Sequence, residues 1–210
     1  HNSAEGQYID ISLLDVQLAT LANQGMNYLA TGKNPERHGN AHPNIVPYQT
    51  FATADGSLIL AIGNDQQFTR FCALCDWHEL ATDALYCSNQ QRVVNRNKLI
   101  PLIAQKLAQH PTQWWVEQLE KCAVPCGPVN TLQQVFNHPQ IKHRAMIKPL
   151  LDKDGKTVVT VAAPINLSAT PLQYHSAPPE LGQHSGQILS DVLNYSKQAI
   201  SHLFEKNIVS

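Results

Sequence analysis

A short polar segment in the first quarter of the chain holds side chains that could contact a substrate. It combines glycine, asparagine, histidine and proline, and its candidate contacts are Gly39, Asn40, His42, Pro43 and Asn44. Glycine lets a backbone approach a ligand closely, while the imidazole and the two amides offer hydrogen-bond donors and acceptors. Loops carry binding sites more often than cores do, so we treat this segment as a candidate substrate loop, called loop 39–44 below. The same composition is also that of an ordinary linker.

A second polar segment contains Asn64 and Asp65 at the point where a predicted strand meets a predicted helix. The free amides at the start of a helix can bind anions and carbonyl groups, which makes these two residues candidate substrate contacts. The simpler interpretation, which we favour, is that Asn64 or Asp65 only caps the helix.

The five cysteines raise the question of a metal site. Two pairs, Cys72 with Cys75 and Cys122 with Cys126, could together supply four thiolates to a zinc ion. However, the first pair recurs at helical spacing with two phenylalanines, which predicts an apolar helix face where a free thiol behaves as a small hydrophobe. We therefore expect core packing and no bound metal.

Composition and charge exclude several classes of protein. The 210 residues carry 15 basic and 16 acidic side chains, a net charge of -1, so no polybasic surface is available to bind a run of phosphates and we expect no nucleic-acid partner. No apolar run approaches the roughly 18 residues of a membrane span, and the first residues lack the pattern of a secretory signal. We expect a soluble, cytoplasmic protein. The absence of an initiator methionine suggests a processed, tagged or excised start.

Hydrophobic periodicity predicts a long helix near the start of the chain. Residues 8–11 alternate like the end of a strand, and the helix spans residues 13–30. Ser12 and Asp15 form a capping box at its start, and Gly32 ends it. The helix is apolar on more than one face, so we expect it to be covered on several sides.

The middle of the chain reads as a compact mixture of strands and helices. A hairpin over residues 51–62 turns at Asp55 and Gly56, whose pair supplies the positive φ of the turn. Further elements are helices over 66–75, 90–109, 112–121 and 131–137, and an edge strand or extended turn over 124–129.

The last third begins with a second hairpin signal over residues 146–162. A proline-punctuated connector spans 164–179, and helices follow over 184–193 and 196–206, the second capped by Ser196. We predict the α/β fold class, with an α+β small domain flanked by helices. The sequence has no Walker, Gly-x-Gly-x-x-Gly, Gly-x-Ser-x-Gly or His-Glu-x-x-His motif.

Several ordered motifs make the chain resemble the family III CoA-transferases, which include formyl-CoA transferase, carnitine CoA-transferase and α-methylacyl-CoA racemase. The likeness is carried by residues 6–15, 37–49, 53–56, 63–68, 124–129, 138–140 and 181–185. It extends over nearly the whole chain, and the subgroup it resembles most is the succinyl-CoA:glutarate type.

The resemblance implies an enzyme in which an aspartate attacks an acyl-CoA thioester. A mixed anhydride forms, CoA thiolate converts it to an aspartyl-CoA thioester, and the acceptor acid completes the exchange. The CoA thioester is then a substrate, and no cofactor is expected. In the family the nucleophile precedes the segment that matches Gly6, so we expect no catalytic residue in this chain; Asp10 and Asp15 match positions after it.

The family fold has a large Rossmann-like domain, a small domain inserted into it, and an interlocked homodimer. The chain is accordingly expected to be the carboxyl-terminal part, without the Rossmann-like half. Its predicted segments are the end of the large domain (1–34), a linker with the substrate loop (35–48), the small α/β domain (49–147), a hairpin and return linker (148–180), and helices that return to the large domain (181–210).

Two functions from different classes follow. The first is part of an acyl-CoA:carboxylate CoA-transferase, inactive alone, whose substrates are an acyl-CoA and a carboxylic acid. Formyl-CoA transferase has glycines where this chain has His42, Pro43 and Asn44, so we expect an acid longer than oxalate. The second is a non-catalytic module that keeps the small-domain fold and dimerises or binds a partner. Under either function the apolar flanking helices predict a homodimer.

Overall fold

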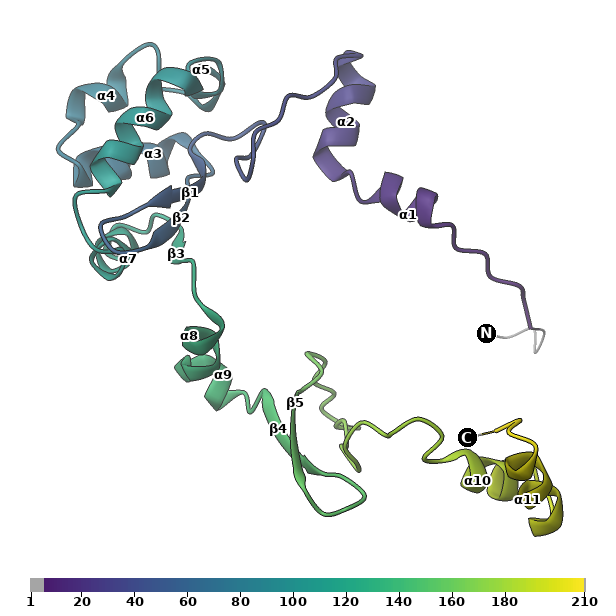
Figure 1. Ribbon diagram of the computed structural model, residues 1–210. Coiled ribbons are helices and arrows are strands. Elements are labelled where there is room, and N and C mark those ends of the chain that lie inside the picture. Colours follow the sequence, from purple (N-terminus) through teal and green to yellow (C-terminus); the bar gives the residue numbers. More distant parts are fainter. Residues whose placement is uncertain (1–5, 210) are drawn as a thin grey trace. The chain divides into compact units, whose positions relative to one another are not determined.

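The computed structural model describes residues 6–209, in two compact units (Figure 1). The first unit ends at Val129 and the second begins at Asn130. This division falls inside the predicted small domain, 49–147, whose limits remain a prediction. The first five residues of the predicted segment 1–34, and the last residue of 181–210, lie outside the described residues.

The single long helix predicted over residues 13–30 is wrong, because two shorter helices take its place: α1 (Leu13–Ala19) and α2 (Ala22–Thr31). Ala22 has a φ of 49°, outside the helical region, and this breaks the hydrogen-bond ladder between them. The predicted capping box is also absent, since the Ser12 side chain makes no capping bond. Gly32 ends α2 with a φ of 67°, as predicted. Residues 8–11 are not assigned to a strand.

A three-stranded antiparallel sheet forms the centre of the first unit. Its order is β1 (Tyr48–Ala52), β2 (Ser57–Ala61) and β3 (Cys126–Pro128), which confirms the predicted hairpin and the edge strand. Leu58 and Leu60 of β2 are fully buried, while Ile59 between them is 41% exposed. This alternation means that one face of the sheet covers the core.

The turn of that hairpin differs from the prediction, because Gly56 does not have a positive φ. The connection is four residues long, and the Thr53 amide donates to the Gly56 carbonyl at 3.0 Å. A Cβ on Gly56 would lie 3.0 Å from Thr112 Oγ1, so close packing is what requires glycine here. Asp55 Oδ1 accepts a 2.8 Å bond from the Thr112 amide and thereby caps the helix that starts there.

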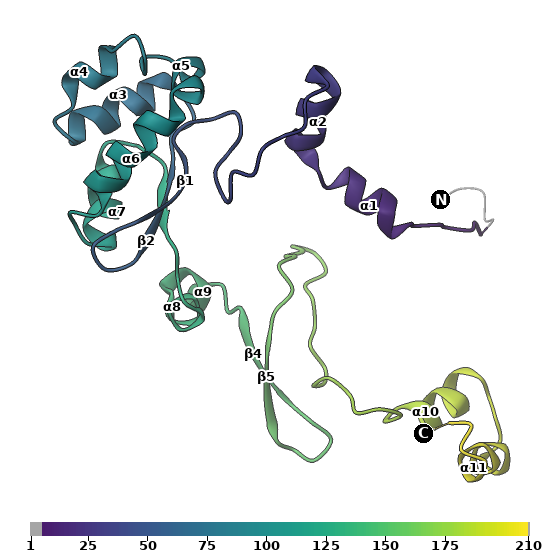
Figure 2. The same ribbon diagram turned by 45° about the horizontal axis from the view of Figure 1, so that its top comes forward.

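Five helices gather beside this sheet in both views (Figure 1, Figure 2). They are α3 (Asp65–Leu74), α4 (His78–Thr82), α5 (Asn89–Val94), α6 (Arg96–Leu107) and α7 (Thr112–Lys121). The predictions of α3 and α7 are confirmed, and α4 was not predicted. The helix predicted over 90–109 is interrupted at Asn95, whose φ of -99° departs from helical geometry and whose side chain donates to the Leu85 carbonyl.

The core of the first unit lies between β2 and these helices. Its fully buried members include Phe71, Leu99, Ile103, Leu107, Trp115 and Leu119. Cys72 and Cys75 also belong to it, which confirms the predicted packing of these thiols, and burial raises the pKa of each to about 12. Within residues 6–209, no group of three or more His, Cys, Asp or Glu side chains is arranged to hold a metal ion.

The second unit follows the predicted order of elements. It contains α8 (Leu132–Asn137), α9 (Pro139–His143), the hairpin of β4 (Ile147–Leu151) and β5 (Thr157–Val161), α10 (Ser185–Gln187), a π-helical turn η1 (Ile188–Val192) and α11 (Lys197–Glu205). Only α9 was not predicted. Ser196 caps α11 through the Ala199 amide, as predicted. In the described part of the chain no helix combines the length and the apolar character needed to cross a bilayer.

Candidate functional site

Loop 39–44 lies between α2 and β1 and is held at both ends. Gly39 has a φ of 61°, a conformation that L side chains rarely adopt, and an added Cβ would meet open space. Asn40 Oδ1 accepts a 3.1 Å hydrogen bond from the Thr50 amide of β1. Glycine is therefore required here for its backbone conformation, and Asn40 anchors the loop to the sheet.

His42 and Asn44 are tied to each other and to α2. The Asn44 amide donates to His42 Nδ1 at 3.1 Å, and His42 Nε2 lies 3.1 Å from Asn23 Nδ2 of α2, so each ring nitrogen has a polar neighbour within the chain. The Asn44 side chain exchanges two hydrogen bonds with Asn27, of 3.1 and 3.0 Å. The His42 ring also packs 5.4 Å from the Tyr48 ring, centroid to centroid. The orientation of the imidazole is thus set by contacts on several sides.

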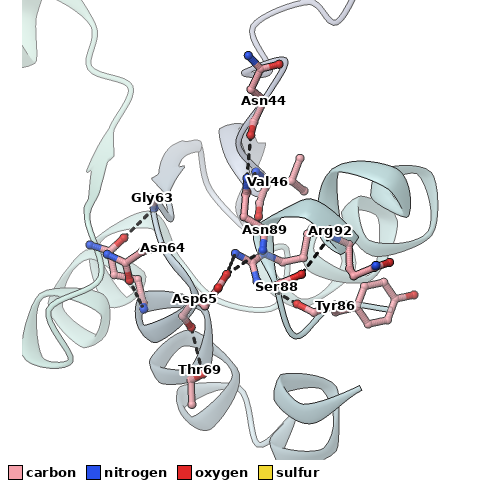
Figure 3. Close-up of polar contacts among 12 residues, drawn as sticks. Asn44, Val46, Gly63, Asn64, Asp65, Thr69, Tyr86, Ser88, Asn89 and Arg92 are labelled. Atoms are coloured by element: carbon pink, nitrogen blue, oxygen red, sulfur yellow. Dashed lines mark hydrogen bonds and ion pairs between the residues drawn. The ribbon is translucent and has the colours of Figure 1, made fainter. Parts of the chain in front are cut away.

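Asn89, the first residue of α5, braces the chain directly after the loop (Figure 3). Its Nδ2 donates to the Asn44 carbonyl at 2.8 Å, and its Oδ1 accepts from the Val46 amide at 3.1 Å. Its backbone amide donates to Asp65 Oδ1 at 2.8 Å. One asparagine therefore links the loop to the start of α3.

Arg92, one turn further along α5, is fully buried and uses its whole guanidinium (Figure 3). Nε donates to the Val46 carbonyl at 2.7 Å, Nη1 to the Tyr86 carbonyl at 2.9 Å, and Nη2 to Asp65 Oδ1 at 2.8 Å. Its Cζ lies 4.4 Å from the centroid of the Phe68 ring. All three nitrogens are occupied, so Arg92 positions the backbone that follows the loop.

Side chains of the second predicted segment take part in this network. Asn64 Oδ1 accepts from the Gln67 amide at 2.9 Å, which confirms that Asn64 caps α3. Asp65 does not cap α3; its carboxylate accepts from the backbone amide of Asn89, the first of α5, and from Arg92. The Gly63 amide donates to Gln67 Oε1 at 2.7 Å. A substrate contact by Asn64 or Asp65 stays a prediction.

Arg96, the first residue of α6, contacts the middle of loop 39–44. Its Nη2 donates to the carbonyls of Pro43 and His42, and its Nε approaches the Val93 carbonyl at 3.4 Å. Burial lowers the pKa of Arg96, and the nearby Glu36 opposes that effect. The loop thus lies beside a half-buried cation.

Sequence reasoning missed Asn89, Arg92 and Arg96. For Arg92 a signal existed, because in the helix predicted over 90–109 it would share a face with the apolar Leu99 and Ile103, seven and eleven residues later. In the structure it lies on α5 and they lie on α6, but all three are fully buried. Together these residues hold loop 39–44, which carries uncharged polar groups, next to the guanidinium of Arg96. Such an arrangement suits an oxygen-rich anionic ligand.

Comparison with known proteins identifies the family of the chain. Residues 1–185 match the family model described as CoA-transferase family III. The succinate–glutarate CoA-transferase of Agrobacterium fabrum is 42% identical over 197 residues, which cover 94% of this chain and 49% of that protein. The human succinyl-CoA:glutarate CoA-transferase is 35% identical, covering 100% of this chain and 48% of that protein. The chain spans about half the length of the curated relatives it matches.

Solved structures share the fold. A CaiB/BaiF family protein from Brucella suis has a TM-score of 0.70 and 42% sequence identity, covering 90% of this chain and 48% of that protein. A Mycobacterium tuberculosis protein with a TM-score of 0.70 is only 19% identical and covers 87% of this chain, so it supports the fold alone.

Proposed function

The chain belongs to CoA-transferase family III, and from that membership we propose that it is the carboxyl-terminal portion of an enzyme that moves CoA between dicarboxylic acids. Succinyl-CoA is the proposed donor and glutarate the proposed acceptor. The observation that carries the proposal is the 42% identity, across 94% of this chain, to the succinate–glutarate CoA-transferase of Agrobacterium fabrum.

The geometry of the loop supports this choice of substrate class. The acceptor acid attacks through its own carboxylate, so it needs hydrogen-bond donors that orient the carboxylate oxygens and do not themselves react. Loop 39–44 offers its own backbone, held in position by Asn40 and Asn89, and the imidazole of His42 if an acid displaces Asn23 from Nε2. A preorganised loop of this kind loses less conformational entropy when a small acid binds.

In this proposal the chain provides the acid-binding side of the site. The nucleophilic carboxylate and most CoA contacts belong to the half that the relatives have in addition. The 210-residue chain alone should then transfer no CoA, because the covalent route through an aspartyl thioester has no nucleophile.

The test is formation of glutaryl-CoA from succinyl-CoA and glutarate, followed by liquid chromatography and mass spectrometry. We expect product from a longer polypeptide in which this chain is joined to the additional half that its relatives have, called the longer polypeptide below. We expect none from the 210 residues alone. His42→Gln should lower kcat/KM for glutarate, whereas His78→Gln, an exposed change on α4, should not.

Two outcomes would contradict the proposal. If the longer polypeptide transfers CoA to no carboxylic acid, the alternative of a non-catalytic dimerisation or binding module replaces it. If the 210 residues alone yield hydroxylamine-sensitive acyl-enzyme, the nucleophile lies in this chain and the assignment of roles is wrong.

A further inference from the structure

An open depression of about 270 Å³ lies next to loop 39–44, between the loop, β1 and the first turns of α6. Three polar groups line it besides Arg96, namely the side chains of His38, Gln49 and Asn97. Among the described residues that line it, only Arg96 is permanently charged and none is a carboxylate; Glu36, which acts on Arg96 through its charge, does not line the depression.

Arg92 and Arg96 are four residues apart in sequence, but their guanidinium groups differ in which nitrogens lack a hydrogen-bond acceptor. Arg92 is fully buried and donates from all three nitrogens. Arg96 is half-buried and donates only from Nε and Nη2. Within residues 6–209, its Nη1 has no hydrogen-bond acceptor and neither ion pair involves it. Two N–H donors of Arg96 are therefore available to a ligand.

The neighbouring amides are available as well. In the described part of the chain, the side chains of Gln49 and Asn97 make no hydrogen bond, although the two residues line the same depression from β1 and α6. Arg96 Nη1 and the neighbouring amide N–H groups could therefore each donate to an oxygen of one carboxylate.

The rest of the wall is apolar, formed by Ala41, Ile100 and Pro101. An acid whose carboxylate met the Arg96 edge could therefore lay methylene groups on these side chains and gain apolar burial. A wall that is part cation and part hydrocarbon suits a carboxylate joined to a short aliphatic chain rather than a free inorganic anion.

We propose that this depression is a carboxylate subsite for a dicarboxylic acceptor acid. One carboxylate of the acid receives CoA, and Arg96 Nη1 and the side-chain amides of Gln49 and Asn97 hold the other. The inference rests on the function proposed above and names the residues that select a dicarboxylic over a monocarboxylic acceptor. Arg96 also supports loop 39–44 through the Pro43 carbonyl, so occupancy of the subsite and the position of the loop are coupled.

The first test compares glutarate with pentanoate, which has the same five carbons but one carboxylate. It uses the longer polypeptide, in which this chain is joined to the additional half that its relatives have. Arg96→Gln should lower kcat/KM for glutarate by about tenfold to a hundredfold, the size expected for a lost charge-assisted hydrogen bond, and change the value for pentanoate far less. Selectivity is the readout because a displaced loop would slow both acids alike.

Gln49→Glu is the second variant, since it adds a negative charge to the subsite without touching the bonds from Arg96 to the loop. It should lower kcat/KM for glutarate at least tenfold and spare pentanoate. Gln109→Glu, the same change at an exposed position just beyond the end of α6, is the matched control and should leave both values unchanged. Equal losses for the two acids in Arg96→Gln and Gln49→Glu would overturn the subsite while leaving the proposed function intact.

A binding measurement on the 210-residue chain separates the subsite from catalysis. In a titration followed by nuclear magnetic resonance, glutarate should shift the Arg96 Nε–H and Gln49 side-chain signals, and its uncharged analogue glutaramide should not. Gln49→Glu should abolish the shift at Arg96. If no CoA transfer occurs but glutarate shifts these signals, the proposed function fails and the carboxylate site stands. If glutaramide shifts them equally, or glutarate leaves them unmoved, the subsite is wrong.

Discussion

Replacing Arg92 with methionine should lower the free energy of unfolding of the first unit by about 2–4 kcal/mol. The change leaves the carbonyls of Val46 and Tyr86 without their donors, and each unpaired buried carbonyl costs about 1–3 kcal/mol. Asp65 adds little, because its side chain is 54% exposed and can be hydrated once Arg92 is gone. Methionine refills most of the volume over Phe68, so the loss reports hydrogen bonding rather than a cavity.

The assay is urea unfolding followed by tryptophan fluorescence. All three tryptophans, Trp77, Trp114 and Trp115, lie in the first unit, so the signal reports that unit alone. Lys98→Met is the matched control, since Lys98 is exposed on α6 and surface changes of this kind stay within about 0.5 kcal/mol. Arg92→Lys should recover only part of the loss, because one ammonium group cannot reach three acceptors arranged for a planar fork.

A loss below about 1 kcal/mol in Arg92→Met would refute this reasoning, since it would mean that water or neighbouring groups satisfy both carbonyls. The same result would remove the argument that Arg92 positions the backbone after loop 39–44. An equal loss in Lys98→Met would show instead that the effect comes from helices α5 and α6 in general and not from the buried guanidinium.

Three further expectations concern thiols, pH and association. Native protein at pH 8 should be alkylated fastest at the exposed Cys87, because burial raises the pKa of Cys72 and Cys75 to about 12 and leaves almost no thiolate there; rapid labelling of Cys72, read by peptide mass, would contradict this. Hydrogen bonds from the Thr112 amide and hydroxyl lower the pKa of Asp55 below 3.8, so its contribution to stability is present above that pH and is lost as the pH falls through the folded-state value. Asp55→Asn should remove this part of the acid dependence in urea titrations, and an unchanged pH profile would show that the cap is not formed. Light scattering should give a mass above 23.3 kDa, because apolar side chains such as Leu13 are largely exposed; a monomer at every concentration would contradict the homodimer.

The sequence by itself determined the elements whose signals are local. Helix α7, the hairpin of β4 and β5 and the Ser196 cap appear where turn residues and periodicity placed them. The buried thiols of α3 followed from helical spacing alone. Each of these depends on residues a few positions apart, so their physics is contained in a short window of sequence. The order of motifs also pointed to the correct family.

The breaks in the predicted helices could not be predicted from a short window of sequence. The left-handed φ of Ala22 and the interruption at Asn95 both occur in stretches whose composition favours a continuous helix. At Asn95 a hydrogen bond to the Leu85 carbonyl, ten residues earlier, competes with the helix, and no local propensity encodes such a contact.

Only the tertiary structure decided what holds the candidate site together. Asn89 and Val46 are 43 positions apart, Asp65 and Arg92 are 27 apart, and Pro43 and Arg96 are 53 apart, yet these pairs join the two polar segments into one network. Sequence analysis found both segments by their residue types but could not tell an anchored side chain from a free one. Whether a donor is used or available depends on where the chain brings an acceptor, and for Arg92 and Arg96 folding decided it differently four residues apart.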